Sequence, residues 1–290
     1  MSAPPPRKAY LSIDFEDFSH DLKRWLGVEH DGALRKEALW HAYETIDGFC
    51  RADLGGARLT FFCTGIVAEK CPEIVQRIAR DGHEVACHYY FHDAVYGDAP
   101  AIFEANLRRA IDTLEAASGQ KVLGFRAPMF TLRASDHEHY RVLAKHLAYD
   151  SSLTVASAAE VEAFRQASRI EGLTLLPVVR RRVVPGLPAM RSGGTFLKLF
   201  PLALTLKALR EGETAGLLPM VYVHPYEFVA DRSFHVPMRE LDGLRGRDRL
   251  YWSLRQAQWH ALRNRSVMPK LRRIFRAYAP GGPMRNLLAN

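Results

Sequence analysis

The sequence has no long hydrophobic run and few cysteines. No apolar stretch approaches the roughly 18–20 residues that span a bilayer, and the start, MSAPPPRKAY, lacks the apolar core of a signal peptide. The four cysteines lie in the first third of the chain and form no CxxC pair. This pattern favours free buried thiols over a disulfide framework. We therefore expect a cytoplasmic protein without a transmembrane segment.

No nucleic-acid-binding motif accompanies the basic residues, although the net charge is +8. We therefore expect no nucleic acid partner. Arginines concentrate late in the chain, and solvated helix faces account for them about as well as an anionic partner does. One hypothesis is that the segment LRRIFRAYAP, with Arg272, Arg273 and Arg276, makes peripheral contact with an anionic membrane.

Strand-like and helix-like segments alternate along the chain, which predicts parallel βαβ units and an α/β fold. The expected strands are residues 10–15, 59–63, 84–87, 122–126, 173–184 and 220–224. The expected helices are residues 33–50, 66–81, 99–118, 137–146, 197–210, 248–263 and 267–278. We expect residues 1–9 to form a flexible tail and residues 10–290 a single domain with C-terminal helices. Polar residues follow several of the strands, at the sheet edge where sites are built.

The sharpest local motif is HxxxH, formed by His88 and His92 directly after the strand HEVAC. In a helical turn, residues four apart lie on one face, so both imidazoles can reach one ion. Zinc and similar ions favour such ligands, and a catalytic site leaves one position open for water. Two surface histidines often produce the same spacing, but this pair lies at the expected sheet edge. The position therefore favours a metal site.

Three acids, Asp14, Glu16 and Asp17, lie together at the end of the first expected strand. Clustered carboxylates repel one another, so a metal-ligand or base role gives a reason for placing them together. The alternative is an exposed acidic loop, or an N-cap for the helix that follows. From the residues alone, these two interpretations are evenly balanced.

Five segments in order give the chain a family resemblance. They are SIDFED, the stretch from TFFCTG to CHYYFH, GFRAPMF, AYDSS and VYVHPYEF. Together they resemble the five motifs of the polysaccharide deacetylases with a NodB homology domain (carbohydrate esterase family 4). The segments Asp14–Phe18, Gly193–Pro201 and His224–Phe228 are most similar to the subgroup associated with exopolysaccharide and exosortase loci.

The resemblance implies a distorted (β/α)7-type barrel and a bound divalent metal, zinc first, with cobalt, nickel or manganese as alternatives. It implies that His88, His92 and Asp17 are the metal ligands. Glu16 then stands at the position of the general base. A second arrangement known in the family makes Asp14 the base and Glu16 a ligand, and the sequence leaves both open.

The later motifs imply further roles. Arg126 would pair with the base carboxylate, and the backbone N–H of Met129 would stabilise the oxyanion. His224 would be the general acid, with its pKa raised by a hydrogen bond to Asp150. Two aromatic residues, Tyr89 and Tyr226, are candidates for lining the sugar site.

The implied activity is removal of the N-acetyl group from an amino sugar in a surface-glycan pathway (capsule, O-antigen or exopolysaccharide). The acetylated sugar is expected as a polymer, a nucleotide-linked form or a lipid-linked form. Two other functions fit the resemblance: an allantoinase-like hydrolase of small cyclic amides, and an inactive relative that binds glycan. The sequence does not indicate the oligomeric state.

Overall fold

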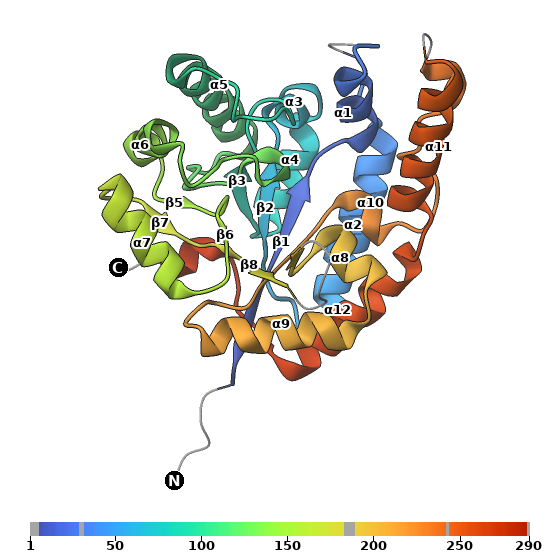
Figure 1. The fold of residues 1–290 in the computed structure, drawn as a ribbon. Coiled ribbons are helices and arrows are strands. Elements are labelled where there is room, and N and C mark those ends of the chain that lie inside the picture. Colours follow the sequence, from blue (N-terminus) through green and yellow to red (C-terminus); the bar gives the residue numbers. More distant parts are fainter. Residues whose placement is uncertain (1–5, 29–31, 183–188, 242–243, 289–290) are drawn as a thin grey trace.

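Seven parallel strands form the central sheet of the computed structural model, which describes residues 6–28, 32–182, 189–241 and 244–288 (Figure 1). Their spatial order is β10 (Met220–Val223), β1 (Lys8–Phe15), β2 (Thr60–Cys63), β3 (Glu84–Cys87), β4 (Gly124–Phe125), β5 (Tyr149–Asp150) and β7 (Thr174–Leu175). β11 (Ala279–Pro280) pairs with the start of β1. β6 (Thr154–Val155), β8 (Val178–Arg181) and β9 (Met190–Arg191) form a smaller sheet. The prediction of a distorted (β/α)7-type fold is confirmed.

Helices surround the curled sheet, as Figure 1 shows. The first six are α1 (Phe18–Trp25), α2 (Lys36–Asp53), α3 (Gly65–Lys70), α4 (Pro72–Arg80), α5 (Pro100–Ser118) and α6 (His137–His146). The remaining ones are α7 (Ala158–Ser168), α8 (Gly194–Leu199), α9 (Leu202–Thr214), α10 (Pro225–Phe228), α11 (Gly246–His260) and α12 (Val267–Ala277). Short 3₁₀ turns lie at Pro128–Phe130, Met238–Glu240, Asn264–Ser266 and Met284–Leu287. Within the described residues, no helix combines the length and hydrophobicity needed to cross a bilayer.

The inner strands are buried on both faces, as expected for a parallel sheet covered by helices. Every residue of β2, β3 and β10 is buried, and one hydrophobic cluster extends from β1 to α12. All four cysteines are buried as free thiols. Because the strands run parallel, their C-terminal ends meet at one edge of the sheet, and the residues that follow them converge there.

Two expected helices are each divided by a proline. The helix expected over 66–81 is α3 and α4, separated at Cys71 because Pro72 begins a new helix. The helix expected over 197–210 is α8 and α9, separated at Phe200 and Pro201. Proline disfavours helical backbone at the residue before it. A further helix, α7, follows the fourth motif and was not predicted.

The expected tail is shorter than predicted. β1 begins at Lys8, where it pairs with β11, so residues 8 and 9 belong to the sheet. Residues 1–5 lie outside the described residues. That residues 10–290 form a single domain stays a prediction.

Candidate metal centre and catalytic site

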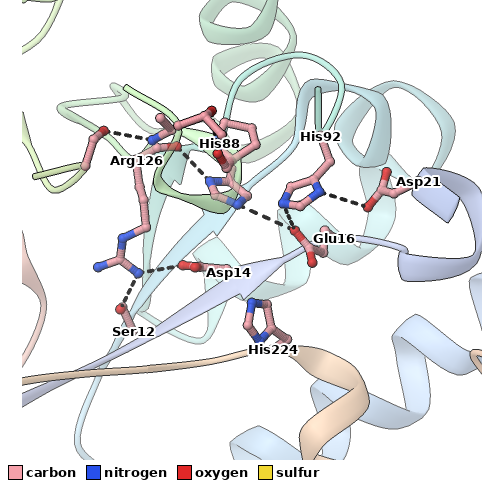
Figure 2. A network of polar contacts seen from close by, with 12 residues as sticks. Ser12, Asp14, Glu16, Asp21, His88, His92, Arg126 and His224 are labelled. Atoms are coloured by element: carbon pink, nitrogen blue, oxygen red, sulfur yellow. Dashed lines mark hydrogen bonds and ion pairs between the residues drawn. The ribbon is translucent and has the colours of Figure 1, made fainter. Parts of the chain in front are cut away.

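The C-terminal ends of β1, β3, β4 and β10 bring the predicted site residues together (Figure 2). Glu16 follows β1, His88 follows β3, Arg126 follows β4 and His224 follows β10. Each of these four residues is buried or nearly so. The sheet therefore assembles one polar site from segments more than 200 residues apart in the chain.

Glu16, His88 and His92 offer three ligand atoms that all lie within 4.8 Å of one another. His92 Nε2 lies 2.6 Å from Glu16 Oε2, and His88 Nε2 lies 3.5 Å from the same oxygen. His88 Nδ1 lies 2.7 Å from the carbonyl oxygen of Arg126, so the other ring nitrogen, Nε2, faces Glu16. Two imidazoles and one carboxylate suit zinc and related divalent ions, with further positions open. The donor chemistry of the site therefore fits the metal that the resemblance implies.

Glu16 and His92 shift each other's pKa. Burial alone would raise the pKa of Glu16, but the imidazoles of His92 and His88 outweigh burial and hold it well below its usual range. Burial alone would lower the pKa of His92. The Glu16 carboxylate outweighs this effect of burial and raises the pKa of His92 to about 9. A buried anion and a buried cation thus stabilise each other where a metal ion would supply the positive charge.

The two histidines do not lie on a helix, contrary to the prediction. Residues 88–92 form a loop in which Tyr89 has φ of 66°. The carbonyl oxygens of Tyr89 and Tyr90 accept the N–H groups of Gly65 and Ile66 at the start of α3, 2.9 Å in each case. These carbonyls therefore bond to α3 instead of closing a helical turn, and the loop still brings the two imidazole rings to 5.2 Å.

The structure places Asp17 outside the cluster, which corrects the expected metal carboxylate. Its Oδ1 accepts hydrogen bonds from the N–H and hydroxyl of Ser19 and caps α1, and its Oδ2 accepts the backbone N–H of Arg35. Asp14 and Glu16 both lie on the cavity wall, whereas the Asp17 carboxylate is directed to the start of α1 and to Arg35. Asp17 is therefore the N-cap of α1, which is the alternative role that the sequence left open.

Asp14 pairs with Arg126. The guanidinium donates from Nη1 to Asp14 Oδ1 at 2.5 Å and to Ser12 Oγ at 2.8 Å, and from Nη2 to Ser151 Oγ at 2.9 Å. Arg126 has no exposed surface, and its Cζ lies 4.1 Å from the centre of the Phe62 ring. The cation is thus fixed on several sides and makes a buried, charge-assisted hydrogen bond to the adjacent carboxylate.

His224 lies across the site from the metal-ligand cluster (Figure 2), and its partner is not the predicted one. Its Nδ1 lies 3.0 Å from Oε2 of Glu227, which also accepts the His224 backbone N–H. Burial alone would lower the pKa of His224, but the Glu227 carboxylate outweighs burial and raises it. The Tyr226 ring stacks on the imidazole with the centroids 5.0 Å apart.

Asp150 is engaged elsewhere, which corrects its expected hydrogen bond to His224. It accepts hydrogen bonds from the N–H and hydroxyl of Ser152, at 2.9 and 2.5 Å. The Ser152 hydroxyl in turn accepts the backbone N–H of Ala127 at 2.8 Å. Burial raises the pKa of Asp150 to about 6. Asp150 therefore supports the backbone beside Arg126.

Asp21, on α1, lies behind His92. Its Oδ2 is 3.7 Å from His92 Nδ1, and its Oδ1 is 3.4 Å from His20 Nδ1. Asp21 Oδ2 and His92 Nδ1 are both buried and lack a hydrogen-bond partner among the described residues. Asp21 therefore faces the Nδ1 side of the ring, while His92 Nε2 faces Glu16. A carboxylate behind a ligating histidine is the usual way to fix its orientation.

A cavity of about 430 Å³ opens onto this site. Asp14, Glu16, His92 and His224 lie on its wall together with Met129 and Tyr226. The rest of the lining is mostly aromatic and includes two arginines: Phe18, Trp25, Phe130, Arg191, Thr195, Phe196, Tyr222, Tyr251, Trp252, Arg255 and Trp259.

Tyr89 does not line the cavity, contrary to the prediction. Its side chain is buried, its hydroxyl donates to Asp98, and its ring stacks on Phe103 with the centroids 5.4 Å apart. It packs between the loop of the two histidines and α5. The tyrosine in this motif therefore holds the loop in place.

The sequence reasoning missed Glu227 as the partner of His224, and it missed Asp21. A signal for Glu227 was present, because His224 and Glu227 form the ends of a capping box at the start of α10. It also missed the aromatic residues of α11, whose place in the cavity depends on how that helix packs.

Comparison with known proteins agrees with these motifs. Residues 54–146 match the family model described as polysaccharide deacetylase. A peptidoglycan deacetylase-like protein of Gibberella zeae is 31% identical over 98 residues. That match covers 33% of this chain and 28% of the relative, so the chain spans less than a third of the relative's length.

Two solved structures share the fold of this chain over nearly its whole length. A polysaccharide deacetylase-like protein of Mycobacterium smegmatis has a TM-score of 0.52 and 21% identity, and covers 97% of this chain and 95% of its own. A carbohydrate esterase family 4 pseudoenzyme of Bacillus anthracis has a TM-score of 0.50 and 15% identity, and covers 99% of this chain and 67% of its own. At these identities the likeness concerns the fold, and the activity of this chain must be argued from its own site.

Proposed function

We propose that this chain is a metal-dependent hydrolase that removes the N-acetyl group from an amino sugar in a surface-glycan pathway. The observation that carries the proposal is the buried cluster of Glu16, His88 and His92, with Asp14 and His224 on the wall of the same cavity. An amide hydrolase needs a site that activates water, a base that removes its proton and an acid that protonates the leaving nitrogen. Each requirement has a candidate here.

Glu16, His88 and His92 would hold a divalent ion, with zinc the first choice and cobalt, nickel or manganese as alternatives. When bound, such an ion supplies Lewis acidity, which makes a water molecule more acidic and polarises the amide carbonyl. We assign the base to Asp14, because Glu16 is engaged with the two histidines while Asp14 lies on the cavity wall and is held there by Arg126. This is the second of the two arrangements that the sequence left open.

The remaining residues complete the hydrolysis. Asp14 takes a proton from the attacking water as its oxygen bonds to the acetyl carbon. His224 gives its proton to the amine nitrogen as the C–N bond breaks, which yields acetate and a free amino sugar. The backbone N–H of Met129 is the candidate donor to the oxyanion. Tyr226 orients the His224 ring by stacking on it.

The shape of the cavity supports a sugar substrate. Aromatic rings such as Trp25, Trp259 and Tyr226 offer flat faces suited to the apolar side of a sugar ring. A volume of about 430 Å³ accommodates one or two sugar units.

The test is acetate release by the metal-loaded protein from acetylated oligosaccharides, nucleotide sugars and lipid-linked sugars, with cyclic amides such as allantoin included. Loss of activity in His88→Ala, with activity retained in His41→Ala, is the expected result. His41 is a matched control because its side chain lies on α2, is 56% exposed and is absent from the cavity wall. Hydrolysis of the cyclic amides alone would assign the site to small molecules. Glycan binding with no turnover of any substrate would indicate an inactive relative.

A further inference from the structure

The outer face of α11 carries an exposed apolar stripe. Leu250 and Leu254 are each 63% exposed, and Ala257 and Ala261 continue the same line. Residues spaced by three and four lie on one side of a helix. Leucines are normally buried, so a row of them along a surface helix indicates a contact with something outside the described part of the chain.

The opposite face of α11 is firmly packed, so the stripe is fixed in its outward position. Gln256 is fully buried, and its amide exchanges two hydrogen bonds with the backbone of Val236, at 2.8 and 3.1 Å. At the C-terminal end, the buried Lys198 ammonium donates to the carbonyl oxygens of Gln258 and Trp259, at 2.9 and 2.7 Å. The helix therefore has no freedom to turn its leucines toward the core.

Positive charge flanks the stripe. Residues 245–265 contain six arginines and one acid, Asp248. Those exposed at the two ends of the stripe are Arg245, Arg247, Arg249, Arg263 and Arg265. A second copy of this chain docking by the same face would bring like charges together, which disfavours association. The complementary partner is anionic with an apolar interior, a description that fits a phospholipid surface.

The stripe adjoins the mouth of the cavity. Tyr251, Trp252 and Arg255 of α11 lie on the cavity wall, and Tyr251 is also 53% exposed between the two leucines. In Figure 1, α11 stands at the edge of the molecule on the side where the strands end. Anything that covers the stripe therefore comes close to the opening of the site.

The segment 271–280, which the sequence suggested for membrane contact, is less suited. Leu271, Ile274 and Tyr278 are buried against the core, and Arg272 Nε donates to Asp53 at 2.8 Å. The apolar side of α12 is therefore already covered. Of these two helices, α11 is the one that presents apolar and cationic groups on the same outward surface.

From these observations we infer that the outer face of α11 docks on an anionic membrane, with Leu250 and Leu254 inserted between the headgroups. Docking would bring the cavity to headgroup level, where an acetylated sugar attached to a lipid through phosphate lies within reach. Arg255 and Arg191 on the cavity wall are the cations that would meet this phosphate. The substrate part of the inference rests on the proposed hydrolase function, and the docking part does not.

The test is flotation of the full-length protein with vesicles of phosphatidylcholine alone or mixed with phosphatidylglycerol. We expect the wild type to bind to the mixed vesicles only. Partitioning of Leu250→Ser/Leu254→Ser should be at least about tenfold weaker, because the variant has no leucine side chains to bury in the bilayer. Ile102→Ser is the matched control, since Ile102 is 55% exposed on α5. It should bind like the wild type.

Three results would overturn the inference: unchanged partitioning of the double variant, equal binding to both vesicle types, or a wild-type dimer that the double variant loses in light scattering. The last result would make the stripe an interface between copies. Asp14→Asn separates the two proposals, because it should bind vesicles normally while releasing no acetate. The double variant should still deacetylate a water-soluble acetylated sugar at the wild-type rate, and its circular dichroism melting curve checks its fold.

Discussion

His224 Nδ1 and Glu227 Oε2 lie 3.0 Å apart within the first turn of α10. The short helix holds both partners, so the geometry of the pair does not depend on a distant strand. The carboxylate directs the other ring nitrogen, Nε2, away from Glu227. It also raises the pKa of His224 against the opposing effect of burial.

Glu227→Gln is expected to move the basic limb of the kcat–pH profile to lower pH. A general acid works only while protonated, so activity falls as pH rises through its pKa. Glu227 raises that pKa, and an amide would not, so the fall should begin earlier. Asp150→Asn is the control, since Asp150 makes no contact with His224 and should leave the basic limb in place. A shifted limb in Asp150→Asn with none in Glu227→Gln would contradict the pairing.

Asp14→Asn is expected to lower kcat by about 10²–10⁴-fold, the usual contribution of a positioned base. Metal content should stay at the wild-type level, because Glu16, His88 and His92 remain. Isothermal titration with zinc and a steady-state assay measure the two properties separately. Loss of zinc binding in Asp14→Asn would show that Asp14 is a ligand and that the base lies elsewhere.

Glu16→Ala and Asp17→Ala should have different effects, because we expect Glu16 to bind the metal and Asp17 to stabilise the fold. Glu16→Ala is expected to lose bound metal. Asp17→Ala should keep its metal but lower the free energy of unfolding by about 0.5–2 kcal/mol, the usual cost of removing an N-cap. Metal analysis and urea denaturation of both variants provide the measurements. If Asp17→Ala lost the metal while folding normally, Asp17 would be the ligand after all.

Asp21→Asn is expected to weaken zinc binding by about 10–100-fold, the usual effect of removing a carboxylate behind a ligating histidine. The amide fills nearly the same volume, so the free energy of unfolding measured without metal should change little. Competition with a zinc-binding dye gives the affinity. Asp47→Asn is a matched control, because Asp47 is also a buried carboxylate beside a histidine, His83, and is not part of the site. Equal zinc affinity in the wild type, Asp21→Asn and Asp47→Asn would show that Asp21 does not support the metal site.

The motif order determined which segments form the site. His88, Arg126 and His224 each follow a buried strand, and parallel strands end at one edge, so their convergence could be predicted from the sequence. The sequence did not determine which acid faces the histidines. Glu16 and Asp17 both follow the last residue of β1, Phe15, and the family resemblance pointed to Asp17.

Only the tertiary structure decided which side chains of the site contact each other. His224 pairs with Glu227 because proline begins α10 immediately after β10 and folds the chain back within one turn, while Asp150 is already bonded to Ser152. The loop of His88 and His92 takes its shape from the N-terminus of α3, which lies on another segment. α11 could be placed along the chain but not around the cavity, since its periodicity cannot tell which neighbour covers each face. The sequence by itself therefore determined the elements and the chemical groups, and packing between distant segments decided their contacts.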